Sequence, residues 1–118
     1  MCPIFQPEED ALPPEDIRFT GLNLELSDDG RRVCVKFSLT PFQQPPDIFI
    51  SILKDGEEVT QAAIIEVFDT DFSFTMHIRA PIPAAEYQCV ISVSYPEKEP
   101  VDRRVAIFTI PEAPFFPA

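Results

Sequence analysis

The sequence predicts an all-β sandwich of about seven antiparallel strands, and three features indicate it. The 118 residues include 14 prolines and only 3 glycines. Proline removes an amide donor and clashes inside a helix, so the segments between prolines favour short strands. Within those segments apolar residues recur at every second position, which is the period of a strand. The chain is 45% hydrophobic with 11 phenylalanines, enough to build the core of one domain.

The first two predicted strands cover residues 17–26 and 32–40, with a turn at residues 27–30 between them. In the first strand the apolar phase changes at Gly21, and a β-bulge at this glycine would reconcile the two phases. In the second strand the inward positions are Val33, Val35, Phe37 and Leu39. Cys34 therefore points the other way.

The third and fourth predicted strands form a hairpin. Residues 47–54 carry apolar side chains on both faces, with Ile48, Ile50 and Ile52 on one and Phe49 and Leu53 on the other. This pattern is typical of a central strand or of one covered by a partner. Asp55 and Gly56 indicate a type I′ turn, so the chain returns through residues 59–68. Two adjacent alanines keep a short helical turn as the alternative in that segment.

The fifth predicted strand shows the clearest alternation in the chain. Its inward residues are Phe72, Phe74, Met76 and Ile78, and its outward residues are Ser73, Thr75, His77 and Arg79. One face of this strand is therefore core and the other is solvated. A proline-rich crossing over residues 81–85 leads to the sixth strand, residues 86–95, and the last strand covers residues 101–110.

Tyr87, Gln88 and Cys89 open the sixth predicted strand. Together with about seven strands of this spacing, they resemble the immunoglobulin-like superfamily, which includes the fibronectin type III domains. The resemblance covers residues 17–110 and implies an immunoglobulin-like sandwich. It also implies that Tyr87 forms a tyrosine corner, in which the hydroxyl group bonds to nearby backbone. This architecture hosts many unrelated functions and does not imply one by itself.

The antibody-type members of the superfamily join a cysteine of the second strand to one of the sixth, which would pair Cys34 with Cys89. The strand period disagrees, because Cys89 is in phase with the inward residues of its strand and Cys34 is not. We therefore expect the two sulfur atoms to face different ways. A bulge near Arg32 is the alternative that would let them pair. The superfamily's core tryptophan is also missing, since the chain has no Trp.

The charge balance excludes several classes of partner. With 20 acidic and 9 basic residues the formal net charge is -11, which repels nucleic acids and anionic membranes. No segment approaches the ~20 apolar residues of a membrane span, and the first residues lack the features of a signal peptide. We expect no nucleic-acid partner, no membrane insertion and a cytoplasmic location. If Met1 is not native, export with Cys2 as a lipidation site is the alternative.

The pattern predicts no enzyme, no cofactor and no metal. His77, the only histidine, falls on a solvated face without a nucleophile or an orienting acid in its pattern. The cysteines lack the close spacing of a zinc site; they stand at Cys2, Cys34 and Cys89. Four aspartates suit the turns in which they lie, with calcium ligation as the alternative; they are Asp28, Asp29, Asp69 and Asp71.

The two ends differ in kind from the middle of the chain. Residues 1–16 are acidic and proline-rich without one basic residue, and residues 111–118 combine proline with phenylalanine. We predict extended arms outside a sandwich of residues 17–110. Proline-stiffened arms lose little entropy on binding, so their large apolar side chains are candidate docking residues, with frayed ends as the alternative. These residues are Ile4, Phe5, Phe115 and Phe116.

The predicted function follows from the arms and the sandwich together. We expect a non-enzymatic protein-interaction module or structural subunit of a larger assembly, which docks through its arms and through a sheet face or edge. A protein is the expected partner. The alternative is an extracellular or cell-surface sandwich that serves adhesion or carbohydrate binding.

Overall fold

Seven antiparallel strands form two facing sheets in the structure, a computed structural model that describes residues 11–27, 30–96 and 98–110. The strands are β1 (Phe19–Leu26), β2 (Arg32–Leu39), β3 (Asp47–Lys54), β4 (Glu57–Ile64), β5 (Asp71–His77), β6 (Glu86–Ser94) and β7 (Asp102–Thr109). A 3-10 turn, η1 (Pro14–Asp16), precedes β1. No helix in the described ranges has the length and apolar content to cross a bilayer.

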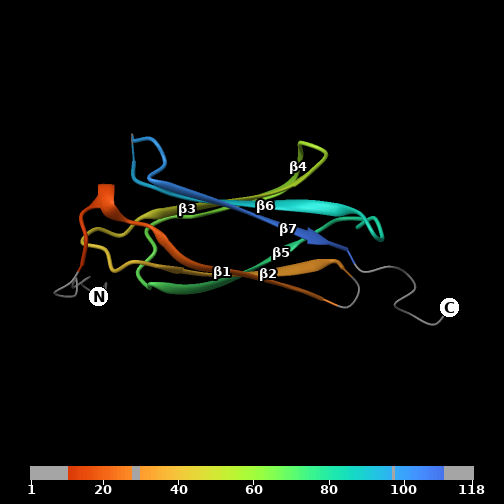
Figure 1. The fold of residues 1–118 in the computed structure, drawn as a ribbon, viewed down its shortest axis with the longest axis horizontal. Helices are drawn as coiled ribbons and strands as arrows, with labels where there is room; N and C mark the ends of the chain where they lie inside the picture. The colour runs from red at the N-terminus through yellow and green to blue at the C-terminus, as the bar shows by residue number, and fades with distance from the viewer. Residues whose placement is uncertain (1–10, 28–29, 97, 111–118) are drawn as a thin grey trace.

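The sheets lie as two layers, as Figure 1 shows. One sheet has the order β1-β2-β5 and the other has the order β4-β3-β6-β7. The predicted immunoglobulin-like sandwich is therefore confirmed. The fourth strand pairs with β3, whereas in constant-type immunoglobulin domains the fourth strand lies in the opposite sheet.

The β3–β4 hairpin forms at the predicted turn. Asp55 and Gly56 have φ values of 53° and 82°, the positive angles that a type I′ turn requires. Ala62 and Ala63, for which a short helical turn was the alternative, lie within β4. This strand ends at Ile64, earlier than predicted, because Glu66 adopts a positive φ of 56°. The Glu66 amide donates to the Asp47 carboxylate at 3.0 Å, which holds the chain in that bend.

The core lies between the two inner faces and consists of the residues that the strand period places inward. From β2, β3 and β6 the buried residues include Val33, Val35, Phe37, Ile48, Ile50, Ile52, Cys89, Ile91 and Val93. The register of β1 against β2 shifts between Phe19 and Gly21, so the predicted bulge is confirmed. The bulge brings Phe19 and Leu22, which differ in phase, toward the same core.

The end of the predicted N-terminal arm lies against the sandwich. Leu12 forms a parallel bridge with Phe42. Its N–H donates to the carbonyl of Pro41 and its carbonyl accepts from the amide of Gln43, both at 2.9 Å. The Leu12 side chain also packs on the core. Residues 11–16 therefore join the domain rather than standing outside it, because the β2–β3 connection offers both backbone partners and apolar surface.

Tyr87 has the surroundings that the resemblance implies for a tyrosine corner. Its side chain is buried and its ring stacks on Phe108, with centroids 5.6 Å apart and an interplanar angle of 13°. The backbone N–H of Ile82 donates to the Tyr87 hydroxyl at 3.3 Å. The hydroxyl thereby ties the start of β6 to the crossing that precedes it.

Replacing Tyr87 with phenylalanine is expected to lower the free energy of unfolding by about 1 kcal/mol, because the Ile82 amide loses its partner while the ring stacking remains. Urea denaturation of both proteins measures the change, and an unchanged m-value serves as the control for an intact fold. Equal midpoints would show that the hydrogen bond adds nothing to stability.

Candidate functional site

The two sheets present different outward faces. The outward positions of the β1-β2-β5 sheet carry polar or small side chains; they include Asn23, Glu25, Lys36, Ser38, Asp71, Ser73, Thr75 and His77. Lys36 Nζ lies 3.0 Å from Glu25 Oε1, and the Ser38 hydroxyl donates to Asp71 at 2.7 Å. This face pairs its polar groups internally and suits water.

The outward face of the β4-β3-β6-β7 sheet is apolar at its centre. Phe49, Val105 and Ile107 remain 43%, 48% and 59% exposed. The register places Phe49 beside Ala63 of β4, and Val90 beside Val105 of β7. We call this surface the outer apolar face and define it by six residues: Phe49, Leu53, Ala63, Val90, Val105 and Ile107.

Polar side chains on this sheet divide into a neutral and a charged set. Neutral groups such as Ser51 and Gln61 stand between the apolar ones, and a hollow of about 370 Å³ lies over Phe49, Ser51, Gln61 and Ala63. The charged outward residues lie near strand ends, toward the margins of the sheet; they are Glu58, Glu86 and Arg103. An apolar centre with a charged rim is the usual composition of a protein–protein interface.

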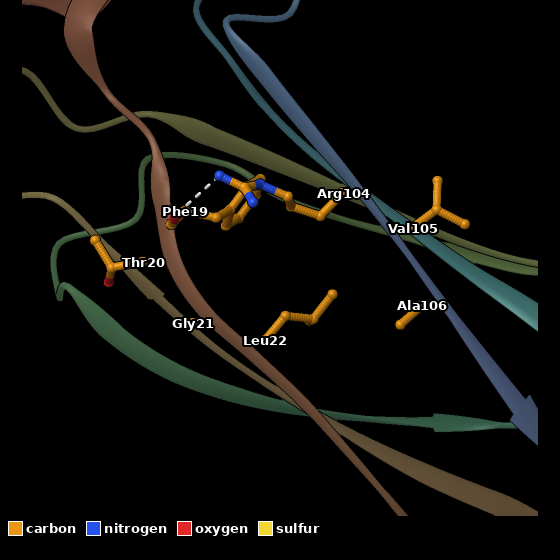
Figure 2. A pocket seen from close by; sticks show the side chains of 7 residues that line it. All are labelled: Phe19, Thr20, Gly21, Leu22, Arg104, Val105 and Ala106. Carbon is orange, nitrogen blue, oxygen red and sulfur yellow. Dashed lines mark hydrogen bonds between the residues drawn. The ribbon is translucent and has the colours of Figure 1, made fainter.

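One open side of the sandwich lies between β1 and β7, which belong to different sheets. Two β7 side chains, Asp102 and Arg104, join the two strands; Figure 2 shows the bond from Arg104 to Phe19. Asp102 accepts from the backbone N–H of Phe19 at 2.9 Å, and Arg104 donates to the Phe19 carbonyl at 3.3 Å. Arg104 also donates to Asp102 at 3.3 Å. The pair thus supplies both backbone groups of Phe19 with a partner, and we call it the Asp102–Arg104 clamp.

Next to the clamp the strands leave a groove of about 290 Å³, lined by residues 19–22 of β1 and 104–106 of β7 (Figure 2). The Asp102 side chain is only 15% exposed. Burial raises the pKa of Asp102, but hydrogen bonds from the Phe19 and Arg103 amides and from Arg104 lower it by more. The resulting pKa lies below the ordinary value, so the carboxylate is charged at neutral pH.

The two described cysteines face different ways, as the strand period predicts. Cys34 is half-buried on the outward side of β2, whereas Cys89 is fully buried in the core, and both are free thiols. The register beside Arg32 is regular, so the bulge that would have let them pair is not formed. Burial raises the pKa of Cys89 to about 11, which keeps its thiol protonated at neutral pH.

The other predicted positions gather at no common site. His77 is exposed on β5 opposite Arg32. Within the described ranges, no three His, Cys, Asp or Glu side chains cluster in a way that would hold a metal ion. The candidate docking residues of the arms lie outside the described residues, as do Cys2 and two of the turn aspartates; the docking residues are Ile4, Phe5, Phe115 and Phe116.

Sequence reasoning found part of the outer apolar face and missed the rest. The apolar residues on both sides of β3 pointed to Phe49 and Leu53 as covered or central. The same signal exists in the last strand, where the apolar Val105 and Ile107 alternate with inward residues. The Asp102–Arg104 clamp has no sequence signal, because Asp102 and Phe19 are 83 residues apart.

Solved structures with a similar fold come from larger proteins. The chain is similar to part of β-glucuronidase 3 from Bacteroides uniformis, with a TM-score of 0.61 and 13% identity over 80% of its length. Domains d3–d4 of the rat CD45 extracellular region give a TM-score of 0.54 and 11% identity over 77%. Lactobacillus rhamnosus β-glucuronidase gives a TM-score of 0.54 and 13% identity over 80%.

The chain spans 12%, 47% and 16% of these three proteins, in the same order. Identities this low show the fold alone. No protein-family model matches the chain, and no curated protein sequence does either.

Proposed function

We propose that this chain is a non-catalytic accessory module that binds another protein through the outer apolar face. The observation that carries the proposal is the difference between the two sheets. Burying apolar surface contributes roughly 25 cal/mol per Å². Phe49, Val105 and Ile107 forgo that stabilisation in the isolated chain, and a covering partner would recover it.

The make-up of the face supports a protein partner over other classes. Neutral serine and glutamine side chains between the apolar residues can hydrogen-bond to a partner's backbone, and the charges lie where a rim would remain wet. A net charge of -11 opposes binding to nucleic acid or to an anionic membrane. Similar folds that form part of longer chains support the role of a module within an assembly.

The terminal segments are part of the same proposal. Their prolines restrict the backbone, so Ile4, Phe5, Phe115 and Phe116 can enter a partner's groove at a low entropic cost. Leu12 and its bridge to Phe42 anchor the N-terminal segment to the sandwich up to residue 11. The truncation that tests docking at that end therefore stops at residue 10.

Co-purification from the source organism tests the proposal. The tagged full chain is compared with a face variant that carries Phe49→Thr and Val90→Thr, both of which keep a strand-forming residue. The matched control carries Ser73→Ala and Thr75→Ala on the polar face of the other sheet. We expect a stoichiometric protein partner with the full chain and the control, and at least about tenfold less with the face variant, which corresponds to 1.4 kcal/mol of binding free energy.

Two truncations in the same experiment test the arms, one without residues 1–10 and one without residues 111–118. Each is expected to fold, to keep its circular dichroism spectrum and to recover less partner than the full chain. If the face variant recovers as much partner as the full chain, the partner does not dock through the outer apolar face. If both truncations recover as much partner as the full chain, the arms do not dock, whatever the result for the outer apolar face.

A further inference from the structure

Strand β7 is the described sheet edge with the least protection against pairing with another chain. The edge strand β1 has a register shift at Phe19 and Gly21, and β4 has one opposite Ile52 and Leu53. The edge strand β5 presents polar residues outward. By contrast, β7 keeps one register along β6 from end to end and contains neither proline nor lysine. Its charged residues, Asp102, Arg103 and Arg104, all lie at its first three positions, and residues 105–109 carry no charge. Its exposed side chains include Val105 and Ile107.

The backbone of β7 offers alternate residues to the open edge. Next to this strand, Ile110 donates to the Ala85 carbonyl and accepts from the Ala84 amide, so both of its backbone groups face the β6 side. Because backbone direction alternates along a strand, the even-numbered residues of β7 face β6 and the odd-numbered ones face outward. The outward set is Arg103, Val105, Ile107 and Thr109.

We propose that β7 pairs antiparallel with β7 of a second copy of this chain, across a two-fold axis at Ala106. The two β4-β3-β6-β7 sheets then continue into each other. In an antiparallel pair, the side chains of directly opposite residues lie on the same face of the sheet. The two-fold axis must therefore pass through a residue, because an axis between two residues would place side chains of opposite faces together. With the axis at Ala106, Val105 lies opposite Ile107 of the second copy and Arg103 opposite Thr109 of the second copy. The outward backbone groups of Val105 and Ile107 are then all paired, whereas the Arg103 amide keeps its own partner, Asp102.

The side chains support this register over its neighbours. An axis at Arg104 would place two arginines directly opposite each other, which destabilises a sheet. An axis at Val105 would place Arg103 opposite Ile107 and leave the outward groups of Thr109 beyond the end of the partner strand. With the axis at Ala106, Val105 and Ile107 of both copies meet as β-branched pairs at the centre of the joint.

Charge complementarity also favours a second copy as the occupant. Thr109 pairs with Glu86 in its own sheet, and both point outward. In the proposed register Arg103 of one copy and Glu86 of the other share a row, two strand spacings or about 10 Å apart. Their side chains are long enough to meet above Thr109. The two-fold axis repeats this contact, so an arginine of one copy lies beside a glutamate of the other at both ends of the β7–β7 interface.

The proposal goes beyond the proposed function, since Phe49 and Leu53 stay uncovered in the pair and free for another protein. Site-specific disulfide formation tests the register in the full chain, with Cys2→Ser, Cys34→Ser and Cys89→Ala as background. Cys89 is replaced because it lies opposite Ala106 in the β6–β7 register and would compete as an intramolecular partner. Residues at the axis form a pair without hydrogen bonds, with Cβ atoms about 4.5–5.5 Å apart, within reach of a disulfide after a small adjustment. Ala106→Cys is expected to become a covalent dimer under mild oxidation, and Val105→Cys to stay a monomer. No dimer with Ala106→Cys, or equal dimer with both, would overturn the proposal.

Sedimentation equilibrium of the chain without added cysteines gives an independent measurement. We expect a concentration-dependent dimer whose dissociation constant rises at least about tenfold in Ile107→Lys and is unchanged in Thr75→Lys on the other sheet. Both substituted positions are exposed, so both variants should fold. A chain that remains monomeric up to about 1 mM would overturn the proposal. Because no other protein is present, this result does not depend on the co-purification experiment.

Discussion

Replacing Phe37 with alanine is expected to lower the free energy of unfolding by about 3–5 kcal/mol. The Phe37 side chain is only 3% exposed and lies at the middle strand of the β1-β2-β5 sheet. Its ring meets Phe19 of β1 edge-on, with centroids 6.0 Å apart, and stacks on Phe72 of β5 at 5.5 Å. The alanine variant loses contacts to both neighbouring strands and leaves a cavity that hydrogen-bonded strands cannot close.

Chemical denaturation measures this loss, and two further variants make it specific. Phe37→Leu keeps most of the volume and should cost less than the alanine variant, which also gives a result if Phe37→Ala does not fold. Phe49→Ala removes the same ring from the outer apolar face, where it is 43% exposed, and should cost clearly less. If Phe37→Ala and Phe49→Ala cost the same, the division into an inner and an outer face would be wrong.

Replacing Asp102 with alanine is expected to cost about 2–3 kcal/mol, because a charged acceptor is lost and its donors remain. The Phe19 and Arg103 amides would both lose a partner at 2.9 Å, and Arg104 would lose its counter-charge. The clamp is the hydrogen-bonded link between the bulge of β1 and strand β7. We therefore expect the side of the sandwich between β1 and β7 to loosen first, which amide hydrogen exchange of β1 would detect.

The pH dependence separates the charge of Asp102 from its packing. The pKa of this carboxylate is lower in the folded chain than its ordinary value of about 3.9, so the unfolded chain binds the proton more readily. Its contribution is fully present above pH ~4 to 5 and is lost as the pH falls through the folded pKa. The stability difference between the wild type and Asp102→Asn should therefore shrink as the pH falls below about 4.

Asp71→Asn is the matched control, because that carboxylate accepts a hydrogen bond from Ser38 on the exposed face of the other sheet. Its effect on stability should be small, because the hydrogen bond is exposed to solvent. A wild-type advantage over Asp102→Asn that persists unchanged at low pH would show that the charge of Asp102 does not stabilise the clamp.

Local features of this chain could be predicted because their causes lie within a few residues. The strands follow from apolar residues at every second position, and the hairpin follows from Asp55 and Gly56, which reach positive φ at low cost. The bulge at Gly21 and the opposite directions of Cys34 and Cys89 follow from the same period. Each of these needs only the geometry of one strand or one turn.

Features that depend on contacts between distant segments were decided by the tertiary structure alone. The period divides each strand into two sides, but it does not say which strands share a sheet. It therefore left open that Phe49, Val90 and Ile107 would meet on one outward surface. Two contacts join segments that are far apart in the chain: the β-bridge between Leu12 and Phe42, and the hydrogen bond from Phe19 to Asp102. Alternation within a strand is set by covalent geometry, whereas these contacts exist only once two packed sheets bring the segments together.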